Sequence, residues 1–461
     1  MASLTDTTRA APATREGAVL GVAAGAAFLA LLDATVANLA VADVRGDFGA
    51  TVGGATWIIT IYAVTFAAFL APAGRLADVV GRRPLFVGGV VAFTVMSLAA
   101  AAAPTLALLL VARGLQGAAA AVMIPASLAV VLADTSPEHR ARAIGAWSAA
   151  GALAAAAGPA IGGVLVDAFG WRSLFLVHVP VAVAVLAGAR FVGVGERTRS
   201  RLPDLLGTAL IGVGIGAAAL AISQASDWSL ADGRTAALLG LAAAALVWAL
   251  IRSTTHAVPA IQTALWESRS LGWANLASTA YGASLFPWLL LGVLFLVNGW
   301  GYSPLEAGLA MTPAAVLAAV VALRAGPLVQ RHGPRPVIVA GALVLAAAGA
   351  VCTTTLPSEP AFLTWWLPVG VLIGIGTGAI TTGTSAAAAL SVAPQHFAAA
   401  TGLNQTGRQI GGALGVAGLA ALLDGRLGAG TGPYAEVYLM CTAATVLVAV
   451  FASRIVLKET P

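Results

Sequence analysis

Apolar runs long enough to cross a lipid bilayer recur along the whole chain of 461 residues. A helix needs about 20 mostly apolar residues to span the hydrocarbon of a membrane. Only 9% of the residues are charged, against roughly 25% in a typical soluble domain. This pattern excludes a water-soluble enzyme and a disordered chain. It predicts an all-α polytopic membrane protein.

The apolar runs form two sets of seven, which predicts fourteen transmembrane helices. The predicted spans are 17–41, 54–74, 84–103, 105–133, 144–166, 172–194, 205–225, 235–252, 272–298, 304–330, 335–356, 361–391, 399–424 and 434–456. The segments between them are too short to fold alone, so the protein is expected to act within the membrane.

Basic residues are distributed unevenly between alternate loops. If the helices alternate in direction, all but six of the 24 Lys and Arg residues lie on the side that holds the amino terminus. Because cytoplasmic loops are enriched in Lys and Arg, we expect a plasma-membrane protein with both termini in the cytoplasm. The net charge of +5 is spread over many loops, so no nucleic-acid partner is expected.

The sequence contains an internal duplication. Residues 74–89 (GRLADVVGRRPLFVGG) resemble residues 326–341 (GPLVQRHGPRPVIVAG), and residues 114–145 resemble residues 371–402 in the same order. Two pseudo-symmetric six-helix halves with two interposed helices are therefore expected. Halves of this kind face each other across a site near mid-membrane in secondary transporters.

The duplication predicts how the chain is divided. The expected segments are an amino-terminal tail (1–16), a first half (17–194), a linker with two extra helices (195–271), a second half (272–456) and a carboxy-terminal tail (457–461).

Two opposite charges are predicted to lie inside the first half. Asp33 and Arg113 each lie about eight residues, roughly 12 Å, from the outer end of a predicted span. A charge at this depth costs at least about 2.5 kcal/mol, so it must be paired, hydrated or protonated. We expect Asp33 to carry a proton and Arg113 to tune its proton affinity. The alternative is a static salt bridge that holds helices together.

Four segments of the first half carry a family resemblance: LDATVANLAV (32–41), GRLADVVGRR (74–83), RGLQG (113–117) and GPAIGG (158–163). They resemble the motifs of the fourteen-helix drug:proton antiporters of the major facilitator superfamily, although Ala42 stands near the place of the usual Pro. The resemblance implies proton-coupled efflux of small amphipathic drugs or antibiotics by alternating access. It also implies a monomer in lipid, driven by a proton gradient with no cofactor.

The resemblance assigns roles to two glycine-containing motifs. The loop motif implies a conformational switch, in which Asp78 interacts with a neighbouring helix amino terminus in one conformation only; the alternative is that its arginines only anchor the loop. The switch residues are Gly74, Asp78, Gly81, Arg82 and Arg83. The antiporter motif implies an exporter hinge rather than mere small-residue packing. Its residues are Gly158, Pro159, Gly162 and Gly163.

Polar and aromatic residues within the predicted spans are candidates for a substrate cavity. Polar groups are costly when they face lipid, and aromatic rings line drug pockets. The expected cavity residues are Asn38, Tyr62, Phe66, Gln116, Asn404, Gln405 and Arg408. For the group around Arg408, hydrogen bonding to a neighbouring helix at Asn275 is the structural alternative. His178 replaces the family's usual Asn, and we expect it to pack or to form a hydrogen bond.

The same motifs bear on two other functions. A proton-coupled importer, or an exporter of a metabolite, on the same fold is the main alternative, and GPAIGG argues against the importer. An enzyme is not expected, because HExxH, GxSxG and P-loop motifs are missing from the sequence. Cys352 and Cys441 lie in apolar runs without a CxxC motif, so no metal site is expected.

Overall fold

The computed structural model describes residues 13–193, 204–224, 228, 232–256, 258–260, 265, 267–423, 426 and 430–456. Most of the predicted amino-terminal tail, the start of the linker (195–203) and the carboxy-terminal tail (457–461) lie outside these residues. The described chain is helical and contains no strand.

The helices follow the predicted order. The first half contains α1 (Ala13–Val36), η1 (Ala37–Leu39), α2 (Ala40–Phe48), α3 (Val52–Val80), α4 (Arg82–Ala101), α5 (Leu106–Asp134), η2 (Pro137–His139), α6 (Arg140–Phe169), α7 (Ser173–Leu176), α8 (His178–Gly188) and η3 (Ala189–Phe191). The interposed helices are α9 (Leu205–Ser223) and α11 (Gly233–Thr255). The second half contains α12 (Arg269–Asn298), α13 (Pro304–His332), α14 (Pro334–Thr355), η5 (Phe362–Trp366), α15 (Leu367–Leu390), η6 (Pro394–His396), α16 (Phe397–Leu423) and α17 (Gly432–Ala452).

Thirteen segments of the described chain are helices long and apolar enough to cross a membrane. The remaining predicted span corresponds to α16, which is 27 residues long. Polar residues from Asn404 to Gln409 interrupt the apolar sequence of α16. The predicted all-α polytopic architecture is therefore confirmed.

Two predicted spans are interrupted. The span at 17–41 breaks into α1 and α2 at η1, and the span at 172–194 breaks at Val177 between α7 and α8. Near the first break, Thr35 Oγ1 donates to the carbonyl of Leu32 at 2.8 Å, and Asn38 Nδ2 donates to that of Ala34 at 3.2 Å. Side chains that bond to nearby carbonyls compete with regular helix geometry.

Glycine-mediated crossings join the two halves at one end of the molecule. α3 crosses α16 where Gly74 meets Gly402, and α6 crosses α13 where Gly145 meets Gly326. A methyl group on Gly74 would overlap the carbonyl oxygen of Ala398, so only glycine permits this approach.

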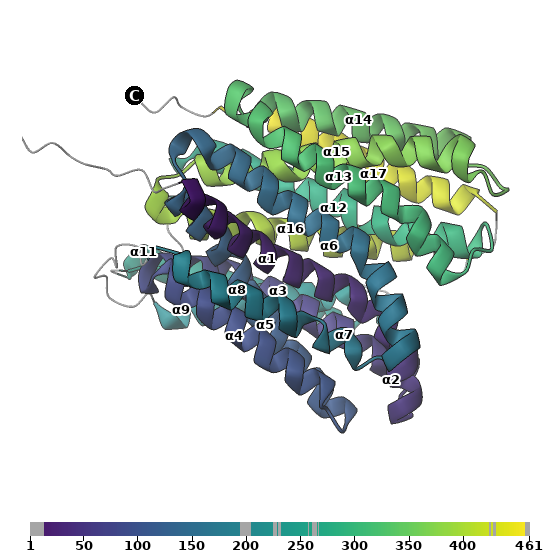
Figure 1. The fold of residues 1–461 in the computed structure, drawn as a ribbon, viewed down its shortest axis with the longest axis horizontal. Coiled ribbons are helices and arrows are strands. Elements are labelled where there is room, and N and C mark those ends of the chain that lie inside the picture. The colour runs from purple at the N-terminus through teal and green to yellow at the C-terminus, as the bar shows by residue number, and fades with distance from the viewer. Residues whose placement is uncertain are drawn as a thin grey trace, which may run out of the picture.

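The two crossings are also related by the internal duplication, since Gly326 is the repeat equivalent of Gly74 and Gly402 that of Gly145. We call the end that contains both crossings the closed end. In Figure 1 the two groups of helices diverge toward the opposite end, which carries α2.

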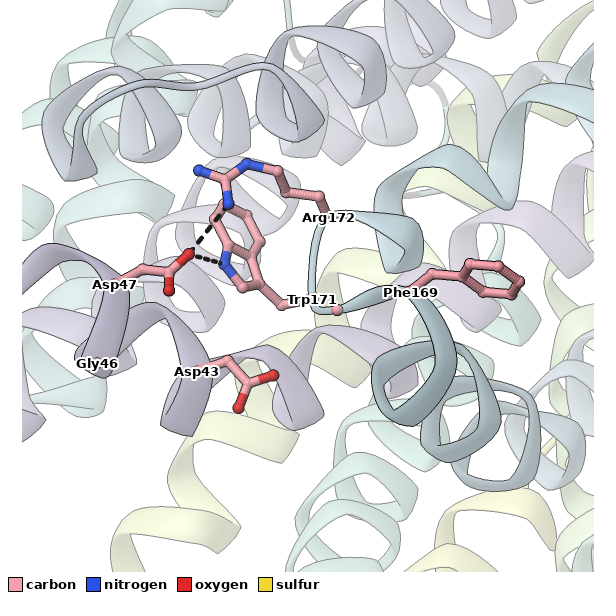
Figure 2. A pocket seen from close by; sticks show the side chains of 7 residues that line it. Asp43, Gly46, Asp47, Phe169, Trp171 and Arg172 are labelled. Atoms are coloured by element: carbon pink, nitrogen blue, oxygen red, sulfur yellow. Dashed lines mark hydrogen bonds and ion pairs between the residues drawn. The ribbon is translucent and has the colours of Figure 1, made fainter.

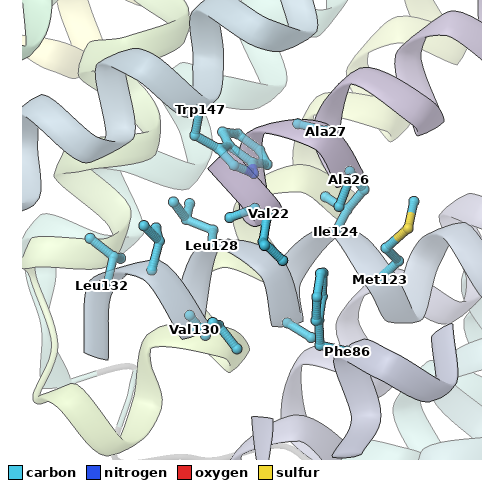
Figure 3. Packing of buried hydrophobic residues seen from close by; sticks show 14 of the residues in the cluster. Val22, Ala26, Ala27, Phe86, Met123, Ile124, Leu128, Val130, Leu132 and Trp147 are labelled. Atoms are coloured by element: carbon cyan, nitrogen blue, oxygen red, sulfur yellow. The ribbon is translucent and has the colours of Figure 1, made fainter. Parts of the chain in front are cut away.

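The first half is held together by an apolar cluster on α1, α4, α5 and α6, which Figure 3 shows. Val22, Phe86, Ile124 and Trp147 meet there, and each is at least nine-tenths buried. Full burial of a side chain of this size is worth roughly 1.5–3 kcal/mol. This packing fixes α1 against α5, and these two helices supply the main charges of the candidate site.

The interposed helix α9 packs on the first half. Ile211 and Ile215 contact a face of small residues on α3 that includes Ala67 and Ala71, and α16 lies at the edge of this contact. At the closed end, Arg75 Nε donates to the carbonyl of Pro259 at 3.4 Å. The extra pair is therefore attached mainly to α3.

Candidate functional site

A buried ion pair joins α1 to α5. Arg113 Nη1 lies 2.8 Å from both carboxylate oxygens of Asp33. Gln116, one turn along α5, accepts a hydrogen bond from the same nitrogen at 2.7 Å and donates to Asp33 Oδ1 at 3.1 Å. All three residues are at most 1% exposed. The contact between Asp33 and Arg113 expected from their depths is therefore made.

Aromatic rings enclose the Arg113 guanidinium. Its central carbon lies 4.4 Å from the ring centroid of Tyr62 on α3 and 5.5 Å from that of Phe175 on α7. Its Nε donates to the carbonyl of Ile58 at 3.2 Å. The ring faces attract the cation, so Arg113 is neutralised on one side and covered on the other.

The structure adds two residues that the sequence did not assign to this site, Ser97 on α4 and His178 at the start of α8. His178 Nδ1 lies 3.0 Å from Ser97 Oγ, and its Nε2 lies 3.8 Å from Asp33 Oδ1. Both residues are fully buried. The only sequence signal for His178 was its place where the family usually has Asn, and Ser97 gave no signal.

The antiporter motif touches both halves of the molecule. A Cβ at Gly158 would overlap Thr35 on α1, only two residues beyond Asp33, and Gly162 faces Leu39 in the same way. On another face of α6, Pro159 packs against Gly308 of α13. The motif therefore links the helix of Asp33 to the second half.

The loop motif closes one of the two crossings. Asp78 accepts backbone hydrogen bonds from Ala398 at 3.3 Å and Ala399 at 2.9 Å, at the amino terminus of α16. Arg82 donates to the carbonyl of Pro394 and lies 4.0 Å from Asp78. A carboxylate at this position accepts hydrogen bonds from the free N–H groups of the first turn of α16. The positive end of the helix dipole also stabilises its negative charge. Gly81, with φ +110°, allows the turn into α4; Arg83 is half-buried.

In the polar group of the second half, the cation Arg408 has no ion-pair partner among the described residues. Arg408 on α16 donates to Thr384 Oγ1 at 3.1 Å, and its guanidinium carbon lies 5.4 Å from the Tyr281 ring centroid. Its Nε has no hydrogen-bond partner in the described chain. Asn404 accepts from Ser278 at 2.9 Å and donates to Asn275 at 3.3 Å.

The predicted cavity residues therefore divide into three groups. Tyr62 and Gln116 belong to the ion-pair site and are at least nine-tenths buried. Asn404 and Arg408 are buried in contacts between helices. Asn404 forms the hydrogen bond to Asn275 that the structural alternative describes. Asn38 is exposed, and Phe66 and Gln405 are half-buried.

A pocket of about 440 Å³ lies at the end opposite the closed end. Figure 2 shows Asp47 of α2 bonded to Trp171 Nε1 at 2.8 Å and to Arg172 at 3.0 Å, with Asp43 and Phe169 nearby. All its lining residues belong to the first half, so this pocket is not the expected chamber between the halves. Among the described side chains, no three His, Cys, Asp or Glu are placed to hold a metal ion.

Comparison with known proteins gives a consistent result. The model of the Major Facilitator Superfamily matches residues 23–205 and 274–461. The cephamycin export protein CmcT of Amycolatopsis lactamdurans is 36% identical, with 86% of this chain and 83% of that protein covered. The puromycin resistance protein pur8 of Streptomyces alboniger is also 36% identical, over 91% of this chain and 85% of that protein.

A solved structure supports the fold. The human organic anion transporter MFSD10 (TETRAN) aligns with a TM-score of 0.68 at 15% identity, and 95% of this chain and 100% of that chain are covered. The residues that the family model matches lie almost entirely on either side of α9 and α11, so these two helices lie between the two matched segments.

Proposed function

The chain belongs to the Major Facilitator Superfamily and is a transporter rather than an enzyme, and on that premise we propose that it exports small amphipathic drugs or antibiotics in exchange for protons. Cephamycins and puromycin, named for two relatives, are the first candidate substrates. We place the protein in the plasma membrane with the closed end and both termini in the cytoplasm. The proposed working unit is a monomer that uses the proton gradient and no cofactor.

The observation that carries this proposal is the buried pair of Asp33 and Arg113. Proton-driven transporters use carboxylates buried among apolar helices to bind and release protons. Its charge is balanced by one neighbouring cation, so adding one proton changes the balance of the whole site. The alternative is a static salt bridge between Asp33 and Arg113. It predicts that protonation of Asp33 does not contribute to the pH dependence of transport.

The energetics suit a conformational switch. Breaking a buried ion pair by removing one charge costs about 3–5 kcal/mol. A change from 1:99 to 99:1 between two conformations needs about 5.5 kcal/mol. Loss of the Asp33 charge would therefore destabilise this arrangement of the site by an amount comparable with the free energy needed to exchange two conformations.

The packing offers a route for this change to reach the second half. α1 carries Asp33 and, two residues on, Thr35, which fits against Gly158 of α6. Pro159 on the same helix fits against Gly308 of α13. When α1 moves relative to α5, α6 must move with it or lose this close contact. In the proposed cycle the proton enters from outside, the closed end opens, drug binds from the cytoplasm, and the proton leaves.

Everted membrane vesicles test the proposal. We expect puromycin added to vesicles that contain the wild-type protein and an imposed proton gradient to cause a pH change inside, read with a fluorescent amine. Asp33→Asn should abolish this exchange, because the amide keeps the shape but cannot bind the proton. Asp167→Asn makes the same chemical change at an exposed position and should leave the exchange intact.

Two results would overturn the proposal. One is proton exchange by Asp33→Asn at the wild-type rate. The other is a wild-type protein that moves neither puromycin, cephamycin nor ethidium under a proton gradient, although it is folded in the membrane.

A further inference from the structure

The hydrogen bonds of Ser97 determine which nitrogen of His178 carries a hydrogen. A serine hydroxyl has one hydrogen and two acceptor lone pairs. Ser97 Oγ lies 2.9 Å from the carbonyl of Phe175, 3.2 Å from Gln116 Nε2 and 3.0 Å from His178 Nδ1. The carbonyl can only accept, so it takes the hydroxyl hydrogen.

The orientation of the Gln116 amide is fixed by a second contact. Its Oε1 accepts from Arg113, which can only donate. Gln116 Nε2 is therefore the end that points to Ser97, and it donates there. Ser97 has then given its hydrogen, so His178 Nδ1 must also donate. All three contacts of Ser97 are satisfied by this single arrangement.

His178 Nε2 then carries no hydrogen, and its lone pair faces the carboxylate of Asp33. It lies 3.8 Å from Asp33 Oδ1 and has no hydrogen-bond partner in the described chain. Two acceptors that face each other at this distance leave room for one hydrogen between them after a small closure. The imidazole is fully buried, so the proton between the two groups would be shielded from the protein surface.

From this geometry we propose that His178 is the second proton-binding group of the site, and that the coupling proton is held between His178 Nε2 and Asp33 Oδ1. This inference rests on the proposed proton-coupled export. The proton comes from the aqueous phase and returns to it, and no other bond is made or broken.

The surroundings offer an acceptor to each N–H group of a protonated His178 ring. With the proton on Nε2, the ring donates to Asp33 through Nε2 and to Ser97 through Nδ1, so both N–H groups are satisfied. The charged groups that face His178 are Asp33 on α1 and Arg113 on α5; Tyr62 on α3 lies beyond Arg113, and the Phe93 ring of α4 packs edge-on at 5.5 Å. Asp33 then lies between two cations, and Arg113 keeps its partner until the proton passes to the carboxylate.

Histidine-selective ¹⁵N NMR on the full-length protein in lipid nanodiscs tests the proposal without a substrate. Of the five histidines, the His178 signals are those lost in His178→Asn. We expect a neutral ring with hydrogen on Nδ1 at high pH that gains hydrogen on Nε2 as pH falls. In Asp33→Asn its midpoint should move to lower pH by about one unit or more, because the attracting carboxylate is gone. A ring that stays neutral throughout, or a midpoint unchanged in Asp33→Asn, would overturn the proposal.

Transport gives the second readout. His178→Asn keeps a short polar side chain but cannot bind the proton, so we expect the pH profile of puromycin efflux to be displaced by about one unit. The matched control His332→Asn changes an exposed histidine and should leave the profile unchanged. An unaltered pH profile of efflux in His178→Asn would refute the proposed role of His178 and only that. Persistent exchange in Asp33→Asn would instead refute the proposed coupling, so the two failures are distinguishable.

Discussion

The polar centres of the two halves are built on different electrostatic principles. In the first half, the charge of Arg113 is cancelled by the carboxylate of Asp33. In the second half, Arg408 meets the hydroxyl of Thr384 and the ring of Tyr281, and no carboxylate bonds to it within the described residues. An arginine stays protonated at any physiological pH. The first half can therefore respond to one proton, whereas the second half presents a constant positive charge.

The largest expected effect comes from leaving the acid of the first half unpaired. Arg113→Leu buries Asp33 without its cation, and we expect a loss of about 3–5 kcal/mol in the free energy of unfolding. Denaturant titration of the purified protein in detergent measures it. The double variant Asp33→Leu with Arg113→Leu removes both charges and should recover most of the loss. Equal losses in the single and double variants would contradict the ion-pair account.

The same substitution in the second half should cost less. Arg408→Leu removes hydrogen bonds to hydroxyl groups but leaves no buried charge behind, so we expect a loss of at most about 1–3 kcal/mol. The same titration checks it, with Arg113→Leu as the reference. A loss as large as that of Arg113→Leu would mean that an acid pairs with Arg408 after all.

One substitution, Asp78→Gln, gives the loop motif of the first half the residue that stands at the equivalent position in the second half. Gln330 occupies the position equivalent to Asp78 and is exposed. Asp78→Gln should weaken the cap on α16 by about 0.5–2 kcal/mol and lower the population of the closed end accordingly. Spin labels on cysteines at the exposed positions Glu138 and Arg331 report the separation of the halves as a distance distribution.

A control at the second loop sharpens this test. Gln330→Ala should not alter the distances, since its side chain lies exposed at the surface. If both variants shifted the distances equally, the carboxylate of Asp78 would have no special role in closure.

The smallest effect is expected outside the membrane spans. Hydrogen bonds from Trp171 and Arg172 lower the pKa of Asp47 below its usual value. Its contribution to stability is therefore full above the pKa of the unfolded chain, about 3.9, and is lost as the pH falls toward the folded value. Acid titration of Asp47→Asn should show a slightly smaller loss of stability below about pH 4 than the wild type. A larger loss would contradict the sign.

Much of the fold could be predicted from apolar run length, because lipid imposes a strict requirement on every span. The repeat also predicted which loops are equivalent, although not that Gly74 and Gly402 meet across the halves. The breaks at η1 and at Val177 were not predictable, because they depend on local side-chain bonds and packing rather than on hydropathy.

The site was predictable where charge was involved and not where a neutral group was. Asp33 and Arg113 stand out because charges are rare in spans. Tyr62 and Gln116 were expected in the cavity, yet they complete the ion-pair site, because which face of a helix meets which neighbour is set by packing. Ser97 is one of many small polar residues, so only three-dimensional contact distinguishes it.

The position of α9 makes the two flanks of the molecule unequal. It stands beside the seam between α3 and α16, whereas among the described helices no such insertion stands beside the seam between α6 and α13. A lipophilic compound in a membrane leaflet would therefore meet α9 at the first flank and the packed faces of α6 and α13 themselves at the second.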